Sequence, residues 1–173
     1  GKTSVDKSTS GSTTLSGERL TIIKHDAAQY GNLLSGAVFS VEALDADGKV
    51  TKTETMTTGS NGKSSLTVEK NVVYRVTETQ APAGYVLDDT PYYFVIVQEG
   101  TKPTLPSNID SSLVNIYTVP QGQSSLEVLL DRYNRKDTTI VKAGEIRVLK
   151  QWVDANGSPI TDPVALTKVP EVK

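Results

Sequence analysis

The sequence predicts an all-β protein built around an antiparallel β-sandwich. Short segments in which apolar and polar residues alternate recur along the chain, as expected of strands with one buried face. Turn signals separate these segments at the spacing typical of sandwich domains, and no window shows sustained helical periodicity. We assign the sandwich to residues 18–137, with 1–17 as a flexible linker or arm and 138–173 as a linker and the opening strand of an incomplete second, similar domain.

Each expected strand lies between residues that favour turns. The dipeptide Asp-Gly at 47–48 and the dipeptide Asn-Gly at 61–62 are hairpin signals, because both tolerate the positive φ angles of tight turns. The segments between the turns are rich in β-branched and aromatic residues, which fit a pleated, half-buried surface. In chain order, we expect strands at 19–26, 36–44, 63–68, 72–79, 92–98, 113–118 and 126–134.

Composition and charge exclude several classes of function. The net charge is −2, which gives no electrostatic footprint for nucleic acid or for an anionic membrane surface. The chain has no cysteine, so it can form neither a disulfide nor a thiolate metal site. Its single histidine, His25, argues against a zinc site and against a Ser-His-Asp triad. We therefore expect no metal, no cofactor and no membrane insertion.

Three polar residues fall on strand faces that the alternation predicts to be buried. Lys24 continues the apolar face of the segment RLTIIKHD, and Glu78 continues the apolar face of YRVTET. Asn134 has the parity of the apolar residues in LEVLLDRYN. Arg132 has that parity too, and a frayed end or a bulge would reconcile it with a buried face. Buried polar groups are costly unless they satisfy one another, so we expect the three to meet.

The chemistry of these three residues is complementary. Burial lowers the pKa of a lysine, and a neutral lysine amine is a nucleophile. Burial raises the pKa of a carboxyl group, and a protonated carboxyl can move protons to and from an amide. Lys24, Asn134 and Glu78 could thus form an isopeptide bond once, with loss of ammonia, and proximity alone can lower such a barrier by about 7–11 kcal/mol.

Each residue also has a plainer interpretation. Asp131 could accept the amine in place of Asn134, with loss of water. Glu78 could be a carboxylate in a structural salt bridge, and Lys24 alone could be a strand-end lysine whose ammonium reaches solvent.

The stretch YRVTETQAPAGY at 74–85 resembles the E-box of Cna B-type (SpaA-like) domains of Gram-positive sortase-assembled pilins and cell-wall-anchored adhesins. LTIIKHDAAQYGNLLSGAVFSV resembles the first two strands of that family, and RYNRK resembles its last strand. The resemblance covers about residues 18–137. It implies an Ig-like, prealbumin-like sandwich in which an isopeptide bond joins Lys24 to Asn134, with Glu78 as the catalyst.

The resemblance also implies a function. The chain would be a structural module of a pilin or surface adhesin, outside the cell at the Gram-positive cell wall, and no enzyme beyond its own single-turnover cross-linking. Its partners would be other pilin or surface-protein domains, sortase during assembly, and a host matrix protein or glycan.

Two other functions compete with the structural one. The first is a host-ligand-binding adhesin that uses the 99–124 loop, an insertion before the last strand, because loops on rigid scaffolds carry recognition. Tyr92, Tyr93 and Tyr117 could add contact area near that loop. The second is an accessory module of a hydrolase, for which these residues supply no turnover site.

We predict that Lys150 forms no intramolecular bond in this chain. The segment EIRVLKQWVDANG repeats the apolar–x–apolar–x–Lys pattern of the first strand, which makes Lys150 the strand lysine of the second domain. After Trp152 the only glutamate is Glu171 and the only asparagine is Asn156, in an expected turn, so no partner follows. Peptide mapping checks this, and a cross-linked peptide containing Lys150 would contradict both the domain boundary and the role of Lys24.

Overall fold

The computed structural model describes residues 17–139, 152–153 and 159–160. The chain divides into two units, Gly1–Lys136 and Asp137–Lys173. In the second unit the short strands β9 (Trp152–Val153) and β10 (Pro159–Ile160) pair in antiparallel fashion. The repeat predicted around Lys150 lies outside the described residues.

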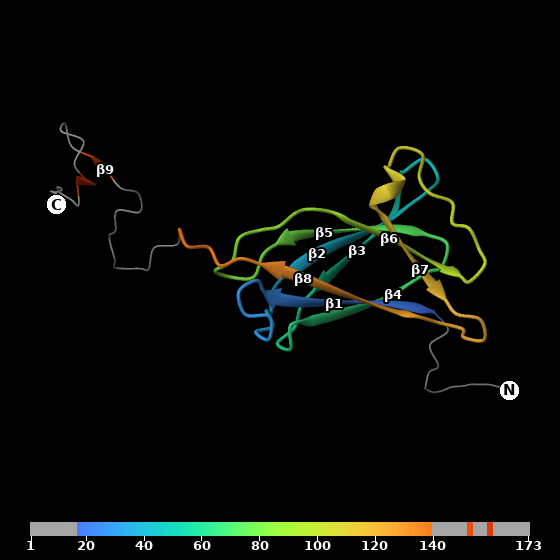
Figure 1. Cartoon of the computed structure of the whole chain (residues 1–173), viewed down its shortest axis with the longest axis horizontal. Coiled ribbons are helices and arrows are strands. Elements are labelled where there is room, and N and C mark those ends of the chain that lie inside the picture. Colours follow the sequence, from blue (N-terminus) through green and yellow to red (C-terminus); the bar gives the residue numbers. More distant parts are fainter. Residues whose placement is uncertain (1–16, 140–151, 154–158, 161–173) are drawn as a thin grey trace. The chain divides into compact units, whose positions relative to one another are not determined.

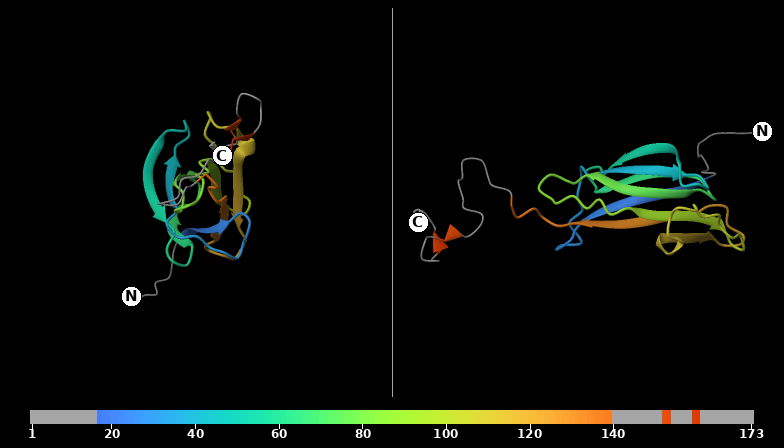
Figure 2. Two further views of the ribbon diagram at one scale, coloured as in Figure 1. Left: turned by 90° about the vertical axis from the view of Figure 1, so that its left-hand side faces the viewer. Right: turned by 90° about the horizontal axis from the view of Figure 1, so that it is seen from above.

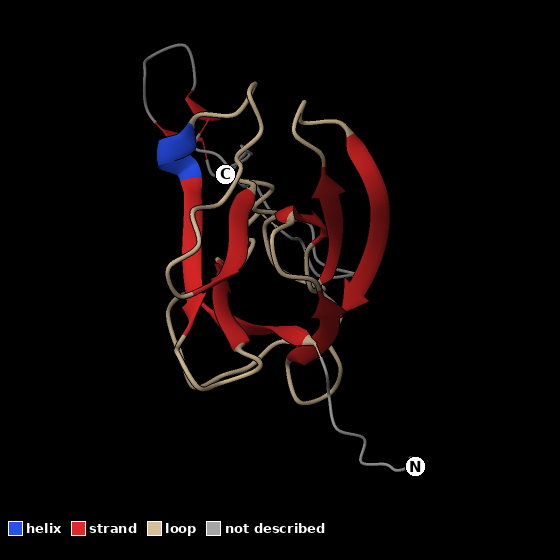
Figure 3. Ribbon diagram, turned by 90° about the vertical axis from the view of Figure 1, so that its right-hand side faces the viewer, coloured by secondary structure: helices blue, strands red, loops and turns tan. Residues whose placement is uncertain are grey.

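The first unit is a sandwich of two β-sheets, which confirms the predicted fold class (Figure 1). The end-on views in the left panel of Figure 2 and in Figure 3 show the two sheets facing each other. One sheet has the order β4-β1-β8 and the other has the order β3-β2-β5-β6-β7. The strands are β1 (Glu18–Asp26), β2 (Val38–Leu44), β3 (Val50–Thr57), β4 (Lys63–Val68), β5 (Val73–Gln80), β6 (Tyr92–Gln98), β7 (Val114–Val119) and β8 (Glu127–Asn134), and a short 3₁₀ turn spans Ser111–Leu113.

Two strand pairs of the sandwich are parallel. The last strand, β8, lies parallel to the first strand, β1, and the pairing runs from Arg19↔Glu127 to Asp26↔Asn134. Strand β7 lies parallel to β6, while the other strand pairs of this unit are antiparallel. Because parallel strands end at the same edge of a sheet, the carboxyl ends of β1 and β8 meet at one end of the molecule.

The ladder between β1 and β8 shows neither the frayed end nor the bulge that would have reconciled Arg132 with a buried face. The register between β1 and β8 passes through Lys24↔Arg132 without a shift. Arg132 keeps the inward parity and is only half-buried, because its guanidinium lies 5.6 Å from the centre of the Tyr92 ring and donates to the Thr90 carbonyl at 3.4 Å. A cation–π contact and a carbonyl acceptor at the edge of the sandwich thus replace the expected distortion.

Strand β3 was not among the predicted strands. Its sequence, VTKTETMT, has one buried residue, Met56, so the alternation that marks a half-buried strand is missing. The strand forms because the Asp-Gly hairpin aligns it with β2, and Asp45 and Lys49 close the turn through a backbone hydrogen bond of 2.9 Å. This strand is therefore stabilised by its hydrogen bonds to β2 across the hairpin turn, and not by burial of apolar side chains.

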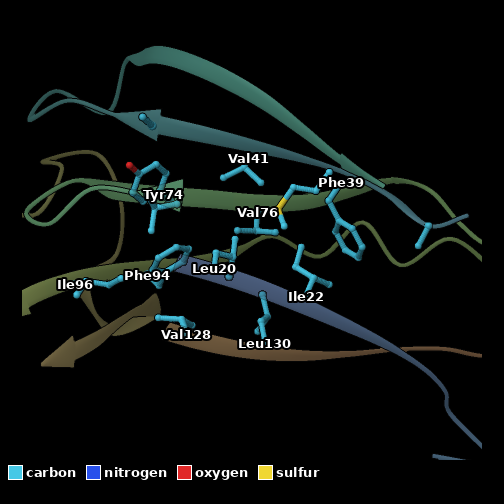
Figure 4. Packing of buried hydrophobic residues seen from close by; sticks show 14 of the residues in the cluster. Leu20, Ile22, Phe39, Val41, Tyr74, Val76, Phe94, Ile96, Val128 and Leu130 are labelled. Atoms are coloured by element: carbon cyan, nitrogen blue, oxygen red, sulfur yellow. The ribbon is translucent and has the colours of Figure 1, made fainter. Parts of the chain in front are cut away.

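The main core lies between the two sheets (Figure 4). The ring of Tyr74 stacks on that of Phe94 at 5.3 Å between centroids, and both residues come from the five-stranded sheet. The aliphatic side chains of the three-stranded sheet pack against them. The labelled members of this core are Leu20, Ile22, Phe39, Val41, Tyr74, Val76, Phe94, Ile96, Val128 and Leu130.

A second apolar cluster covers the outer face of the five-stranded sheet. Val95 and Val97 alternate with the inward Phe94 and Ile96, so they point to the other face, and both are fully buried. Leu105 and Ile109 pack on this cluster from the connection between β6 and β7. The continuous apolar run of β6 therefore reflects burial on both faces. Within the predicted 99–124 loop, Leu105 and Ile109 cover the outer face of the sheet, and Val114–Val119 form its edge strand β7.

We predict that Gly62→Ala destabilises the domain far more than Gly122→Ala. Both glycines have positive φ, +75° and +84°, so each substitution carries backbone strain of about 1–2 kcal/mol. At Gly62 an added Cβ would also lie 2.4 Å from the Cβ of Leu33 and 3.0 Å from the backbone nitrogen of Leu34, whereas nothing lies within 4 Å at Gly122. Urea denaturation should give a loss of about 2–4 kcal/mol for Gly62→Ala, and equal losses for the two variants would contradict the packing.

Candidate cross-linking site

Lys24 and Glu78 meet between the two sheets. Lys24 lies on the inward face of β1, two residues after Ile22, and Glu78 lies on the inward face of β5. The lysine Nζ lies 2.9 Å from Glu78 Oε1, and the side chains are 1% and 2% exposed. Both side chains therefore point into the sandwich, as the alternation of apolar and polar residues predicted.

Asn134, at the end of β8, completes the contact. Its Nδ2 donates to Glu78 Oε2 at 2.8 Å and to the carbonyl oxygen of Val86 at 2.9 Å. The residue is 1% exposed, and its Oδ1 is buried without a hydrogen-bond partner. One carboxylate thus contacts the lysine with one oxygen and the asparagine amide with the other, which brings all three predicted residues together.

The segment 81–88, which follows β5, holds the site from outside. Its Val86 carbonyl accepts from Asn134, and its Asp88 N–H donates to Glu78 Oε2 at 3.0 Å. The Val86 N–H donates to the Arg135 carbonyl at 2.8 Å, which fixes the segment beside the end of β8. These contacts could not be predicted from the sequence, because backbone groups leave no side-chain signal.

The surroundings of Lys24 lower the pKa of its ammonium group. Burial holds the pKa of the Lys24 ammonium below its usual value, although the hydrogen bond and the charge of Glu78 oppose that change. The nearby charge of Arg132 lowers the pKa of Lys24 further. The Phe39 ring, whose centroid is 5.5 Å from Nζ, helps to exclude water. The site therefore brings together the amine of Lys24, the carboxyl group of Glu78 and the amide of Asn134 away from solvent.

Asp131, the alternative acceptor, lies on the opposite face of β8 and is exposed. Its Oδ1 lies 2.7 Å from His25 Nε2, and His25 Nδ1 lies 2.6 Å from the carbonyl oxygen of Tyr30. The His25 ring also stacks on Tyr133, with 5.0 Å between centroids. Asp131 therefore belongs to a cluster on the outside of the sheet, and Asn134 is the residue of β8 that contacts Glu78.

Asp26 and Tyr85 form a second, partly buried contact beside the site, which was not among the predicted site residues. Asp26 is 1% exposed, and its Oδ2 accepts from the Tyr85 hydroxyl at 2.7 Å. Its Oδ1 accepts from the backbone N–H groups of Ala28 at 2.7 Å and Gln29 at 3.1 Å. The final tyrosine of YRVTETQAPAGY was the available signal, since a tyrosine hydroxyl at a packed site usually has a partner.

The tyrosines considered for ligand binding have structural contacts. The hydroxyls of Tyr92 and Tyr117 form a hydrogen bond with each other, and both rings pack against the main core. Burial raises the pKa of Tyr92. Tyr93 packs against the outer cluster. Across residues 17–139 and the two short strands beyond, no group of acidic residues and histidine could hold a metal ion, and no helix is long and apolar enough to cross a membrane.

We predict that Asp26 contributes acid-sensitive stability. The Tyr85 hydroxyl, followed by the Ala28 N–H, holds the pKa of Asp26 below its usual 3.8. A carboxyl whose pKa is lower in the folded chain stabilises the fold above its unfolded pKa and loses that effect as pH falls through its folded pKa. The difference in melting temperature between the parent and Asp26→Asn should be constant above about pH 5 and shrink below about pH 4. A difference independent of pH would contradict this.

Comparison with known proteins agrees with the fold. A family model described as the SpaA prealbumin-like fold domain matches residues 18–108. Similar solved structures include the TIE protein of Bacillus anthracis (22% identity, 76% of this chain and 18% of that chain, TM-score 0.43). They also include the group B streptococcus pilus 2b backbone protein (24% identity, 73% of this chain and 44% of that chain, TM-score 0.42). A third is the Bacillus cereus major pilin subunit BcpA (25% identity, 69% of this chain and 29% of that chain, TM-score 0.44).

The chain aligns with less than half the length of each of these three proteins. Among curated proteins, none matches it. The family model spans just over half of the 173 residues and includes both Lys24 and Glu78. The resemblance noted in the sequence is thereby confirmed, and the chain belongs to the SpaA prealbumin-like domain family.

Proposed function

We propose that this chain is a structural module of a pilin or surface adhesin, outside the cell at the wall of a Gram-positive bacterium, and that a Lys24–Asn134 isopeptide bond stabilises it. The observation that carries the proposal is the buried contact in which Glu78 lies 2.9 Å from Lys24 Nζ and 2.8 Å from Asn134 Nδ2. Its partners are neighbouring domains of the same surface assembly and the sortase that builds it.

The proposed reaction begins with proton transfer from the Lys24 ammonium to Glu78. The neutral Nζ then attacks Cγ of Asn134, and the new Nζ–Cγ bond forms as the Cγ–Nδ2 bond breaks. Glu78 delivers its proton to Nδ2, which it already contacts, and takes up a second proton from Nζ. Of the five protons on the two nitrogens, one stays on the new amide, three leave in ammonia and one remains on Glu78. The reaction consumes its own residues, so the chain turns over once.

The strand topology gives the bond a mechanical role. The chain enters the sandwich at the start of β1 and leaves it at the end of β8, and these strands are parallel neighbours (Figure 1). Tension on the two ends would shear this pair. A bond from Lys24 to Asn134 would carry that tension and shield the sequence between them. By analogy with disulfides, closing a loop of about 110 residues stabilises the fold by roughly 4–5 kcal/mol.

The alternative is a host-ligand-binding adhesin module that uses the 99–124 region. Leu113 and Ile116 in this region are 55% and 51% exposed, which supports a contact surface. Two observations favour a structural role instead. Leu105 and Ile109 pack on the outer cluster, and the hydroxyls of Tyr92 and Tyr117 form a hydrogen bond with each other. A binding screen against host matrix proteins and glycans separates the two functions, with a Leu113→Ser/Ile116→Ser variant as the control.

We predict that the folded chain is lighter than its sequence mass by one ammonia. The reason is the amide of Asn134, whose nitrogen leaves when the bond forms. Intact mass spectrometry of the folded chain measures this loss directly. The full sequence mass in a folded sample would exclude the cross-link.

Substitutions at two positions of β8 identify the acceptor in the same measurement. Asn134→Ala should restore the full mass, and Asn134→Asp should give a loss of water. Asp131→Ala should leave the loss of ammonia unchanged, because Asp131 faces His25 on the outside of the sheet. A loss of water from the parent chain would assign the bond to Asp131.

We predict that Glu78→Ala folds, does not cross-link and melts roughly 10–20 °C lower than the parent. The substitution removes the proton carrier but keeps the strand and the turn that follows it. Glu54→Ala is the matched control, since Glu54 is a partly exposed strand glutamate paired with Lys52 at the surface. A loss of ammonia from Glu78→Ala would leave Glu78 as a structural salt-bridge partner.

A further inference from the structure

We infer that Tyr85 is a positioning residue for the cross-linking reaction, and that it acts through Asp26. This inference rests on the proposed function, because it concerns the geometry of the same reaction. We call the hydrogen bond between the Tyr85 hydroxyl and Asp26 Oδ2 the Tyr85–Asp26 clasp. It accounts for the last tyrosine of the stretch 74–85, which the reaction itself does not use.

The segment 81–88 orients two of the three reacting groups. The Val86 carbonyl accepts from Asn134 Nδ2 at 2.9 Å, and the Asp88 N–H donates to Glu78 Oε2 at 3.0 Å. These contacts decide how the amide plane of Asn134 and the carboxylate of Glu78 face each other. A shift of this segment would therefore move the acceptor and the proton carrier at once.

The clasp ties this segment to the end of β1. Tyr85 directly precedes Val86, and its hydroxyl lies 2.7 Å from Asp26 Oδ2. Asp26 lies two residues after Lys24 and pairs with Asn134 in the ladder between β1 and β8. The Ala27 N–H also donates to the Asn134 carbonyl at 2.9 Å. The clasp thus connects segment 81–88, which orients Glu78, to the end of β1, which bears Lys24 and pairs with the end of β8 at Asn134.

Asp26 is fixed independently of the tyrosine. The N–H groups of Ala28 and Gln29 donate to its other oxygen, so its carboxylate stays in place when the tyrosine hydroxyl is removed. The segment itself is only lightly packed, since Leu87 is 45% exposed. Apart from the clasp, the bonds that hold the segment in the described structure include Asn134 Nδ2 to the Val86 carbonyl, the Val86 N–H to the Arg135 carbonyl, and the isolated bridge between Tyr85 and Lys136. Loss of the hydroxyl should therefore loosen the segment without unfolding the sandwich.

The test measures how fast ammonia is lost after folding. Unreacted chain is recovered from inclusion bodies in denaturant, diluted into buffer, sampled over time and weighed by mass spectrometry, while circular dichroism follows folding. Since a misplacement of about 1 Å can slow a positioned reaction about 100-fold, Tyr85→Phe should slow ammonia loss by roughly 10- to 100-fold. Asp26→Asn, which changes the clasp from the other side, should also slow it.

Tyr133→Phe is the matched control. Tyr133 lies on β8, next to Asn134, and is 43% exposed with its ring against His25. Removal of its hydroxyl should leave the rate unchanged. Equal rates for the parent and Tyr85→Phe would overturn the inference while leaving the cross-link intact. No ammonia loss from the parent would overturn the cross-link, and the inference with it.

A second readout separates positioning from stability. In the Glu78→Ala background, where no bond forms, Tyr85→Phe should shift the melting temperature by a few degrees at most. A purely structural role would instead lower the melting temperature strongly in that background and leave the rate of ammonia loss from folded chain unchanged. That pair of results would also overturn the inference.

Discussion

The contact between Lys24 and Glu78 is the interaction on which the arrangement of the site depends. Two ionisable groups lie in the core between the sheets, where desolvation costs several kcal/mol for each ion. Their mutual attraction and the hydrogen bonds from Asn134 and Asp88 to the carboxylate offset that cost. Conversion to an amide would remove the lysine charge altogether. The attraction within the pair thus offsets the cost of burial, and the proposed bond would remove the buried charge of the lysine.

The parallel pairing of β1 and β8 brings Asn134 to this contact. Residues more than a hundred positions apart reach one edge of a sheet because the register between these strands runs without a shift to Asp26↔Asn134. The same pairing lays the two ends of the domain along one line of tension. The proposed cross-link and its proposed role under tension therefore both depend on the position of the last strand beside the first.

The connections that precede and follow β6 have different roles. The 99–113 connection folds back over the outer face and buries Val95 and Val97, which extends the core beyond the space between the sheets. The 81–88 connection stays lightly packed and uses its backbone to orient Asn134 and Glu78. The first connection thus extends the core, and in the proposed function the second positions the groups that form the cross-link.

The sequence by itself determined the all-β class, most of the strands and the inward orientation of Lys24, Glu78 and Asn134, because the period of two along a strand is a local property. It could not determine strand β3, whose exposed residues carry no burial signal, or the straight register at Arg132, which a cation–π contact with Tyr92 permits. Only the tertiary structure decided which backbone groups orient the site and that Asp26 receives the Tyr85 hydroxyl. These contacts join segments far apart in the chain, and long-range pairing leaves no trace in local composition or periodicity.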